Sequence, residues 1–271
     1  TIVNFNLTVE KRKIALMETT LSAESKKKIL WLGEIPTPYR LPLQYQIERN
    51  SKCEILFAYC AEKQADRSWG AQEKELQKIW GALHHKVLEG WQFQRKGSNP
   101  YSLFLNPEVW SLIRKGRFDL VIIGGWFQPT MFLAALACFS RRIPFVVHSE
   151  SHGLKKRFFL KRLFKYIYPG ALIRLASAFL ATGSQSAKYL NQYNRKSPKF
   201  IFPNAANNDF FISENKRLEK KKNTLIRELH YPCRHNFLFV GRMVEIKGIR
   251  DFINAFDKVA DRITDWGVVI V

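Results

Sequence analysis

The sequence predicts an α/β protein built on a doubly wound parallel sheet. Short apolar runs recur along its 271 residues, and the clearest, DLVIIGG at 119–125, is continuously apolar rather than alternating. Such runs are typical of parallel strands that are buried on both faces. Stretches with apolar residues at helical spacing lie between the runs. Because strand and helix alternate, we expect ligands at the carboxyl ends of the strands.

The expected strands of the first half end in glycine or in a polar loop. They cover residues 28–33, 53–59, 85–88, 119–125, 144–148, 178–183 and 199–202. The expected helices cover residues 43–49, part of 61–81, 103–115, the segment after Pro129, and 184–193. Pro129 suits the first turn of a helix, and Ser184 or Ser186 could cap the helix at 184–193. We expect a loop at 89–100.

The chain changes character after Asn204. Residues 205–235 are polar and poor in large apolar side chains, which predicts a linker with one short helix near 222–229. Residues 236–271 then read as strand, helix and strand, the first part of a second domain that we expect to continue beyond Val271. Residues 28–204 should form the N-terminal domain. Residues 1–27 should be an extension without fixed structure, with Met17 as the natural start.

The chain is strongly basic. Lys and Arg number 44 against 23 Asp and Glu, which gives a formal net charge of +21. This charge indicates an acidic partner: a phosphate-bearing small molecule, anionic lipid or nucleic acid. The basic residues are scattered, however, and we recognise no nucleic-acid module. A non-catalytic protein that binds nucleic acid or another anion is therefore the alternative to an enzyme.

The cysteine and histidine spacings indicate no metal site. The four cysteines form no CxxC pair and no His-flanked metal spacing. His148 and His152 are four positions apart, but they flank a strand end rather than share a helix, so we expect no metal. Unpaired cysteines favour a reduced, cytoplasmic chain. No apolar run approaches the roughly 18 residues that a membrane-spanning helix needs, and no signal-peptide pattern is present.

One segment combines basic and aromatic residues. Residues 154–173 read LKKRFFLKRLFKYIYPGALI. This pattern would suit an amphipathic helix lying on an anionic membrane surface. It would equally suit a helix that packs on the sheet with a basic outer face, and the sequence leaves both interpretations open.

The clearest chemical signal lies near the end of the chain, at 236–256. An apolar strand is followed by Gly241, Arg242 and Lys247, and then by apolar residues at helical spacing. A helix N-terminus presents unpaired backbone N–H groups and favours an anion. Arg and Lys beside it add a fork and a point charge that suit phosphate oxygens. The sequence therefore predicts an anion site on this βα loop.

Other candidate residues follow strands of the first half. Tyr39 and Arg40 come after the first strand, and Trp126 and Gln128 come after the strand at 119–125. At the carboxyl edge of the sheet we expect these four to contact an acceptor substrate. Glu150 could be a polar group of that site or a carboxylate paired with a nearby cation.

These features together resemble glycosyltransferase family 4. The second half carries FVGRM at 239–243, KGI at 247–249 and AF at 255–256, like the opening of the family's donor domain. The first half matches in order, with a Gly-ended strand before Pro-Tyr-Arg, DLVIIGGW at 119–126, ATGS at 181–184 and Pro-Asn at 203–204. The resemblance implies a GT-B type fold, with a complete N-terminal Rossmann-like parallel-sheet domain and only the first βαβ of a second Rossmann-like domain.

The resemblance also implies an activity, which is transfer of a sugar from a nucleotide-sugar donor to a hydroxyl of a lipid-linked, glycan or small-molecule acceptor, with retention of configuration. Arg242 and Lys247 match the pair that grips the donor diphosphate and stabilises its departing charge without a metal or other cofactor. Gly33 and Gly241 match glycines that let the backbone approach the ligand. Asn204 either lines the donor cleft or caps a turn. Such an enzyme would work in the cytoplasm, at the inner membrane face if residues 154–173 bind lipid.

Two departures from the family pattern are visible. Many members carry a histidine after the fourth strand, where this chain has Gly124, Gly125 and Trp126. Many carry another histidine-bearing segment after the fifth strand, where this chain has Glu150 between two serines, so Glu150 is our third catalytic candidate beside Arg242 and Lys247. We expect the family's E-x7-E segment, which holds the sugar and ribose, to lie beyond Val271.

Overall fold

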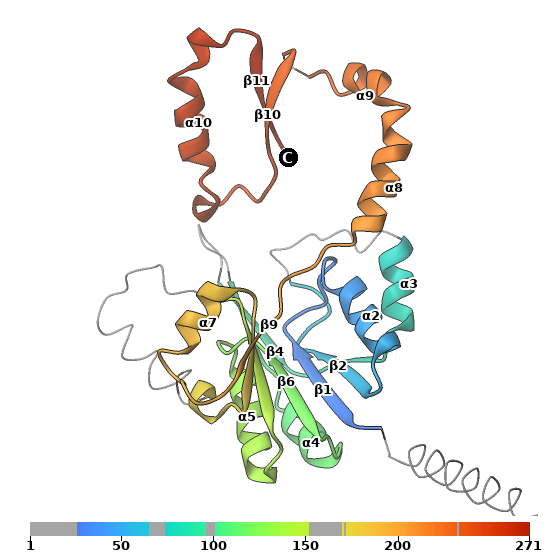
Figure 1. Ribbon diagram of the computed structural model, residues 1–271, viewed down its shortest axis with the longest axis vertical. Helices are drawn as coiled ribbons and strands as arrows, with labels where there is room; N and C mark the ends of the chain where they lie inside the picture. Colours follow the sequence, from blue (N-terminus) through green and yellow to red (C-terminus); the bar gives the residue numbers. More distant parts are fainter. Residues whose placement is uncertain (1–25, 65–73, 96–100, 152–169, 171, 232) are drawn as a thin grey trace, which may run out of the picture.

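A seven-stranded parallel sheet forms the larger part of the molecule (Figure 1). The computed structural model describes residues 26–64, 74–95, 101–151, 170, 172–231 and 233–271. The strand order is β3-β2-β1-β6-β7-β8-β9, and each pair is parallel. The strands are β1 (Lys28–Gly33), β2 (Glu54–Tyr59), β3 (His85–Val87), β6 (Leu120–Gly124), β7 (Phe145–Ser149), β8 (Ala178–Ala181) and β9 (Lys199–Ile201).

The strand order reverses beside β1. From β1 the chain builds outward through β2 and β3 on one side, and later through β6 to β9 on the other. In a sheet of this kind the connections diverge at the reversal and leave a crevice at the carboxyl ends of the two central strands. A ligand site is therefore expected where β1 and β6 end.

Helices cover both faces of the sheet, as Figure 1 shows. They are α2 (Leu41–Asn50), α3 (Lys74–Ala82), α4 (Glu108–Lys115), α5 (Pro129–Arg141) and α7 (Ser184–Leu190). Successive side chains of a strand point to opposite faces. Leu30 and Leu32 of β1 accordingly pack in the core under α4 and α5, whereas Trp31 packs in the core under α2 and α3.

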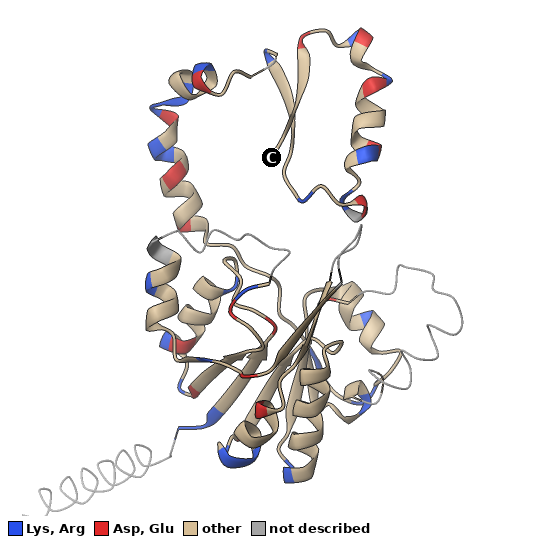
Figure 2. Ribbon diagram, turned by 180° about the vertical axis from the view of Figure 1, so that it is seen from behind, with Lys and Arg blue, Asp and Glu red and all other residues tan. Residues whose placement is uncertain are grey.

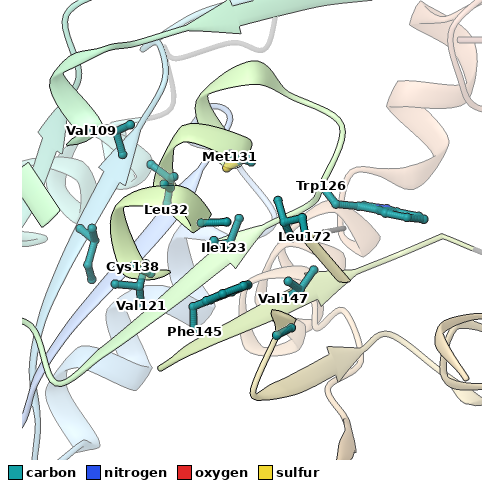
Figure 3. Close-up of a cluster of buried hydrophobic side chains, with 14 of the residues drawn as sticks. Leu32, Val109, Val121, Ile123, Trp126, Met131, Cys138, Phe145, Val147 and Leu172 are labelled. Carbon is teal, nitrogen blue, oxygen red and sulfur yellow. The ribbon is translucent and has the colours of Figure 1, made fainter. Parts of the chain in front are cut away.

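Figure 3 shows the first of these cores, in which Met131 and Cys138 of α5 lie against Leu32, Val121 and Ile123. These side chains are almost completely removed from water. Each fully buried Leu, Ile, Val or Met of this size contributes roughly 1.5–3 kcal/mol to folding. The sheet is thus a rigid platform for the loops at its carboxyl edge.

Two of the local predictions were wrong. Strands β4 (Trp91–Arg95) and β5 (Tyr101–Leu105) form an antiparallel pair, where we expected a loop and the start of a helix. In β4 apolar and polar residues alternate, and in β5 buried residues alternate with more exposed ones. Both patterns have the period of two that a strand requires. Helix α4 begins only at Glu108.

The cap of α7 also differs from expectation. Neither Ser184 nor Ser186 caps it, because Gly183 occupies the N-cap position without a side-chain hydrogen bond. The Ser186 hydroxyl instead donates to the Ser149 carbonyl at 2.8 Å. Ser186 therefore ties α7 to the end of β7.

Two helices, not one, follow β9. They are α8 (Asn208–Glu219) and α9 (Lys222–Glu228). The sequence analysis missed α8, although Asn207 caps it by accepting a hydrogen bond from the Phe210 N–H at 3.2 Å. The two helices lead from the sheet to a smaller α/β unit (Figure 1). The domain boundaries at 28, 205 and 236 remain predictions.

The smaller unit has the expected order of strand, helix and strand. Strands β10 (His235–Phe239) and β11 (Trp266–Ile270) are parallel, and α10 (Ile249–Asp257) packs against them between two short 3-10 turns, η1 (Glu245–Lys247) and η2 (Ala260–Arg262). Phe252 and Phe256 of α10 contact Phe239 and Phe237 of β10, with ring centroids 5.8 and 6.1 Å apart. These aromatic contacts hold the helix on the strands.

Two expectations concern residues outside the described part of the chain. They are the extension at 1–27, of which 1–25 are not described, and the basic aromatic segment at 154–173, of which only 170, 172 and 173 are described. Among the residues that the structure describes, Lys and Arg are spread over the sheet's helices and over the second unit (Figure 2). Within the described ranges, no helix combines the length and the apolar character needed to traverse a bilayer.

Candidate functional site

A hollow opens at the carboxyl end of β1, beside the reversal of strand order. Its volume is about 520 Å³ with open solvent included. The lining comes from β1 and the loop after it, from α2, and from the ends of β2, β6, β7 and β9. The lining residues are Trp31, Gly33, Ile35, Tyr39, Arg40, Leu43, Gln44, Tyr59, Gly124, His148, Phe202, Asn204 and Ala205.

An ion pair lies at this hollow. The Arg40 guanidinium, from the loop after β1, pairs with the Glu150 carboxylate, which directly follows β7. The Asn204 side-chain amide donates to the same carboxylate oxygen at 3.4 Å. Arg40 and Glu150 expose 29% and 49% of their side chains, so the pair is accessible from solvent. The structure thus joins Arg40, Glu150 and Asn204, which are far apart in sequence.

His148 completes the polar part of the hollow. It is the fourth residue of β7, is 4% exposed, and meets the Phe202 ring edge-on with centroids 5.5 Å apart. Its Nε2 has no hydrogen-bond partner among the described residues. Burial and, to a smaller extent, the charge of Arg40 lower the pKa of His148 to about 4, although the charge of Glu150 opposes them. His148 is therefore neutral at neutral pH.

The sequence analysis considered His148 only as half of a metal pair. His152 lies outside the described residues, so that pair has no described geometry. Residues 145–149 are buried throughout, so only the position of His148 at the strand's carboxyl end could have singled it out. Across the described part of the chain, no group of three or more His, Cys, Asp or Glu side chains could hold a metal ion.

Aromatic side chains and glycines shape the rest of the hollow. Trp31 contacts the rings of Phe57 and Phe202, with centroids 5.7 and 5.8 Å apart. The buried Tyr59 hydroxyl donates to Gln44 at 2.8 Å, and burial raises the pKa of Tyr59 well above its ordinary value. A Cβ at Gly124 would lie 2.6 Å from the Leu32 carbonyl oxygen, so only glycine fits there.

Two of the residues that were predicted to contact the acceptor, Trp126 and Gln128, instead make hydrogen bonds within the fold. Trp126 is buried, donates its indole N–H to the Ser151 hydroxyl at 2.9 Å, and meets Tyr189 edge-on. Gln128 is 4% exposed and ties the start of α5 to the β4–β5 pair. Its amide accepts from the Phe104 N–H at 2.9 Å and donates to the Ser102 carbonyl at 3.1 Å. Of the four nominated residues, Tyr39 and Arg40 line the hollow, whereas Trp126 and Gln128 do not.

The predicted anion site lies on the loop between β10 and α10. Arg242 and Lys247 are both exposed there, and Gly241 lies two positions after Phe239, where β10 ends. Gly248 has φ 72° and ψ 20°, in the left-handed region that glycine adopts without strain, and it forms the N-cap of α10. The loop thus presents two cations beside the first N–H groups of a nine-residue helix, an arrangement that attracts anions.

Comparison with known proteins places these sites in a broader context. A family model described as a glycosyl transferase 4-like domain matches residues 68–205, about half of the chain. No curated protein sequence matches.

Solved structures share the fold at low identity. A UDP-N-acetylglucosamine 2-epimerase is 13% identical with a TM-score of 0.53, over 90% of this chain and 63% of that one. The UDP-GlcNAc 2-epimerase from Neisseria meningitidis, solved with UDP-GlcNAc bound, is 14% identical with a TM-score of 0.50, over 90% and 64%. A glycosyltransferase from Rickettsia africae is 15% identical with a TM-score of 0.49, over 91% and 68%.

The likeness to the two epimerases bears on the fold alone. The chain spans less than two thirds of the length of the two epimerases. The seven-stranded parallel sheet and its match to them confirm the predicted α/β fold of GT-B type.

Proposed function

Because this chain belongs to the glycosyl transferase 4-like family, we propose that it is part of an enzyme that transfers a sugar from a nucleotide-sugar donor to a hydroxyl acceptor with retention of configuration. The family match over 68–205 carries the proposal, and it agrees with the resemblance noted from the sequence. Work in the cytoplasm, with lipid contact through 154–173, belongs to the same proposal.

The donor diphosphate binds at the β10–α10 loop in this proposal. Arg242 and Lys247 are exposed on one loop beside a helix N-terminus, so both can reach phosphate oxygens without first breaking a buried structure. When the sugar leaves, the diphosphate gains negative charge. Fixed cations and N–H dipoles at that point stabilise the transition state more than the ground state.

The acceptor binds at the β1 hollow. The hollow lies at the carboxyl edge of the sheet, where ligands of open α/β sheets bind. Glu150 is the carboxylate there, and Asn204 and Arg40 hold it in place. A carboxylate so placed can accept a hydrogen bond from the acceptor hydroxyl and orient it for attack.

Turnover of nucleotide sugars by the natural full-length protein tests the proposal. Arg242→Ala and Lys247→Ala should each lower kcat/KM about 100-fold, since each removes one preorganised group from the departing charge. Arg262→Ala and Lys258→Ala are matched controls, because both residues are exposed in the same unit beyond the loop. Full activity in both loop variants would refute the assignment of the donor site.

Epimerisation of a nucleotide sugar is the second candidate. Two solved structures, with TM-scores of 0.53 and 0.50 to this chain, are named as UDP-N-acetylglucosamine 2-epimerases. Incubation with UDP-N-acetylglucosamine and no acceptor separates the candidates. A new sugar epimer would favour epimerisation, whereas release of the nucleotide only when an acceptor hydroxyl is present would favour transfer.

A further inference from the structure

We propose that the β1 hollow binds an anionic group, a phosphate or a carboxylate, carried by the acceptor, with Arg40 and His148 as its hydrogen-bond donors. When the anion binds, it takes the place of the Glu150 carboxylate on the Arg40 guanidinium. The term acceptor rests on the proposed function, but the anion site itself does not.

Unpartnered buried polar atoms mark the hollow as a built site. Among the described residues, the buried side-chain nitrogen and oxygen atoms without a hydrogen bond include Arg40 Nε and His148 Nε2, and both residues line the hollow. A third, Thr37 Oγ1, lies on the same loop as Arg40, and Thr37 is 6% exposed. Buried polar groups are normally hydrogen-bonded, so a group of orphans at one place indicates a missing partner.

The chemistry of these atoms selects an oxyanion. A guanidinium has only donors, arranged in a fork that matches a carboxylate or phosphate in two-point contact. Arg40 uses Nη2 on Glu150 and keeps Nε unused. The neutral His148 ring can present an N–H at Nε2 in one tautomer. A carboxylate or phosphate offers several acceptor oxygens and the negative charge that a guanidinium attracts, so it suits these donors better than a neutral hydroxyl does.

Glu150 holds the place of the ligand. It is a carboxylate on the one cation of the hollow's lining, so the pair already shows which kind of group Arg40 takes. Half of the Glu150 side chain is exposed, so it can move off Arg40 when displaced and stay at the hollow beside Asn204, where it can still meet the acceptor hydroxyl. Partly exposed ion pairs contribute little net stability, and the exchange is correspondingly easy.

The aromatic lining of the hollow strengthens an ionic contact between Arg40 and a bound anion. Trp31, Tyr59 and Phe202 surround the polar atoms with aromatic rings. Water is partly excluded, so an ionic contact here is less screened than on an open surface. A bound anion would also favour the protonated form of His148, which the neighbouring Arg40 now disfavours.

The histidine ring resonances of the full-length protein give a direct test. The probes are inorganic phosphate, glycerol 3-phosphate and glucuronate, with glycerol and glucose as neutral controls. The signal that His148→Asn removes should shift in a saturable way with glycerol 3-phosphate or glucuronate and not with the neutral probes. Arg40→Gln should weaken this binding at least 10-fold, Arg40→Lys less, and Arg227→Gln, an exposed arginine on α9, not at all.

Glu150→Gln separates a binding role from a structural one. Loss of the competing carboxylate should tighten anion binding about 5-fold. If the Arg40–Glu150 pair had only a structural role, Arg40→Gln and Glu150→Gln would both lower the stability of the protein and leave its affinity for the anion unchanged. Unchanged affinity in Glu150→Gln, a shift with neutral probes alone, or a response to inorganic phosphate but to neither larger anion would overturn the proposal.

The Arg242→Ala/Lys247→Ala variant tests whether anion binding at the hollow is independent of the donor site. Its His148 signal should respond to glycerol 3-phosphate like that of the wild type, even where it no longer binds nucleotide sugar. Failure of nucleotide-sugar binding in the wild type would contradict the proposed function and leave the anion site standing. Loss of the His148 response in the double variant would place the anion at the β10–α10 loop and overturn the inference.

Discussion

The β1 hollow and the β10–α10 loop both present cations to a ligand, but they are built in different ways. On the loop, Arg242 and Lys247 are exposed and lie five positions apart in sequence. In the hollow, Arg40 and His148 come from different parts of the sheet and carry buried atoms without partners. If both sites bind anions as proposed, the exposed loop suits release of a leaving group, whereas the partly buried hollow suits holding a ligand in a fixed orientation.

The largest effect that we predict comes from adding a side chain at Gly124, which lines the hollow. A Cβ at Gly124 would lie 2.6 Å from the Leu32 carbonyl oxygen, so Gly124→Ala must push β6 away from β1. We expect a loss of about 3 kcal/mol in the free energy of unfolding, measured by urea denaturation. Anion binding at the hollow should be lost with it.

Gly81→Ala is the control for that substitution. Gly81 lies in α3, and an added Cβ there would meet nothing within 4 Å. Since alanine favours a helix over glycine, this variant should be as stable as the wild type or slightly more stable. If Gly124→Ala and Gly81→Ala were equally stable, β1 and β6 could move apart at the hollow without a loss in the free energy of unfolding.

The pH dependence of stability tests the burial of His148. Burial, with Arg40 beside it, lowers the pKa of His148 from 6.5 to about 4. Between these values the unfolded chain binds a proton that the folded chain does not, so stability falls as the pH drops from 6.5 towards 4. From pH 7.5 to pH 5 this one residue should cost about 2 kcal/mol.

His148→Gln should be less sensitive to pH over that interval by the same amount. Parallel stability curves for the wild type and His148→Gln would show that His148 is solvated in the folded protein. A bound anion at Arg40 should shrink the difference, because it makes the protonated ring less costly.

The two regions also differ in how far the sequence could reveal them. The loop is local: Gly241, Arg242, Lys247 and Gly248 stand within eight positions, so the sequence alone could suggest an anion site there, which stays a prediction. The hollow is not local. Arg40, His148 and Asn204 meet only because the strand order places β1 between β2 and β6, which no short stretch of sequence contains.

The sheet itself was largely predictable, since buried parallel strands are continuous apolar runs. The antiparallel pair of β4 and β5 was missed because Leu103 and Leu105, with the apolar residues after them, also fit a helical period. Gln128 was assigned to an acceptor from its position at the sheet edge. Its two amide hydrogen bonds to β5 depend on that strand pair, so its structural role could not be inferred without it.

The smallest effect we predict concerns the shape of the loop rather than its charge. Gly248 has φ 72°, and an alanine in that region costs about 1 kcal/mol. If the turn must hold Lys247 beside the start of α10, Gly248→Ala should weaken nucleotide-sugar binding about 5-fold, as that free energy implies. Asparagine tolerates the left-handed conformation better, so Gly248→Asn should restore most of the affinity. Calorimetry of the full-length protein measures both variants. If alanine and asparagine bind the nucleotide sugar equally, the backbone of the loop does not position its cations, and charge alone distinguishes the loop from the hollow.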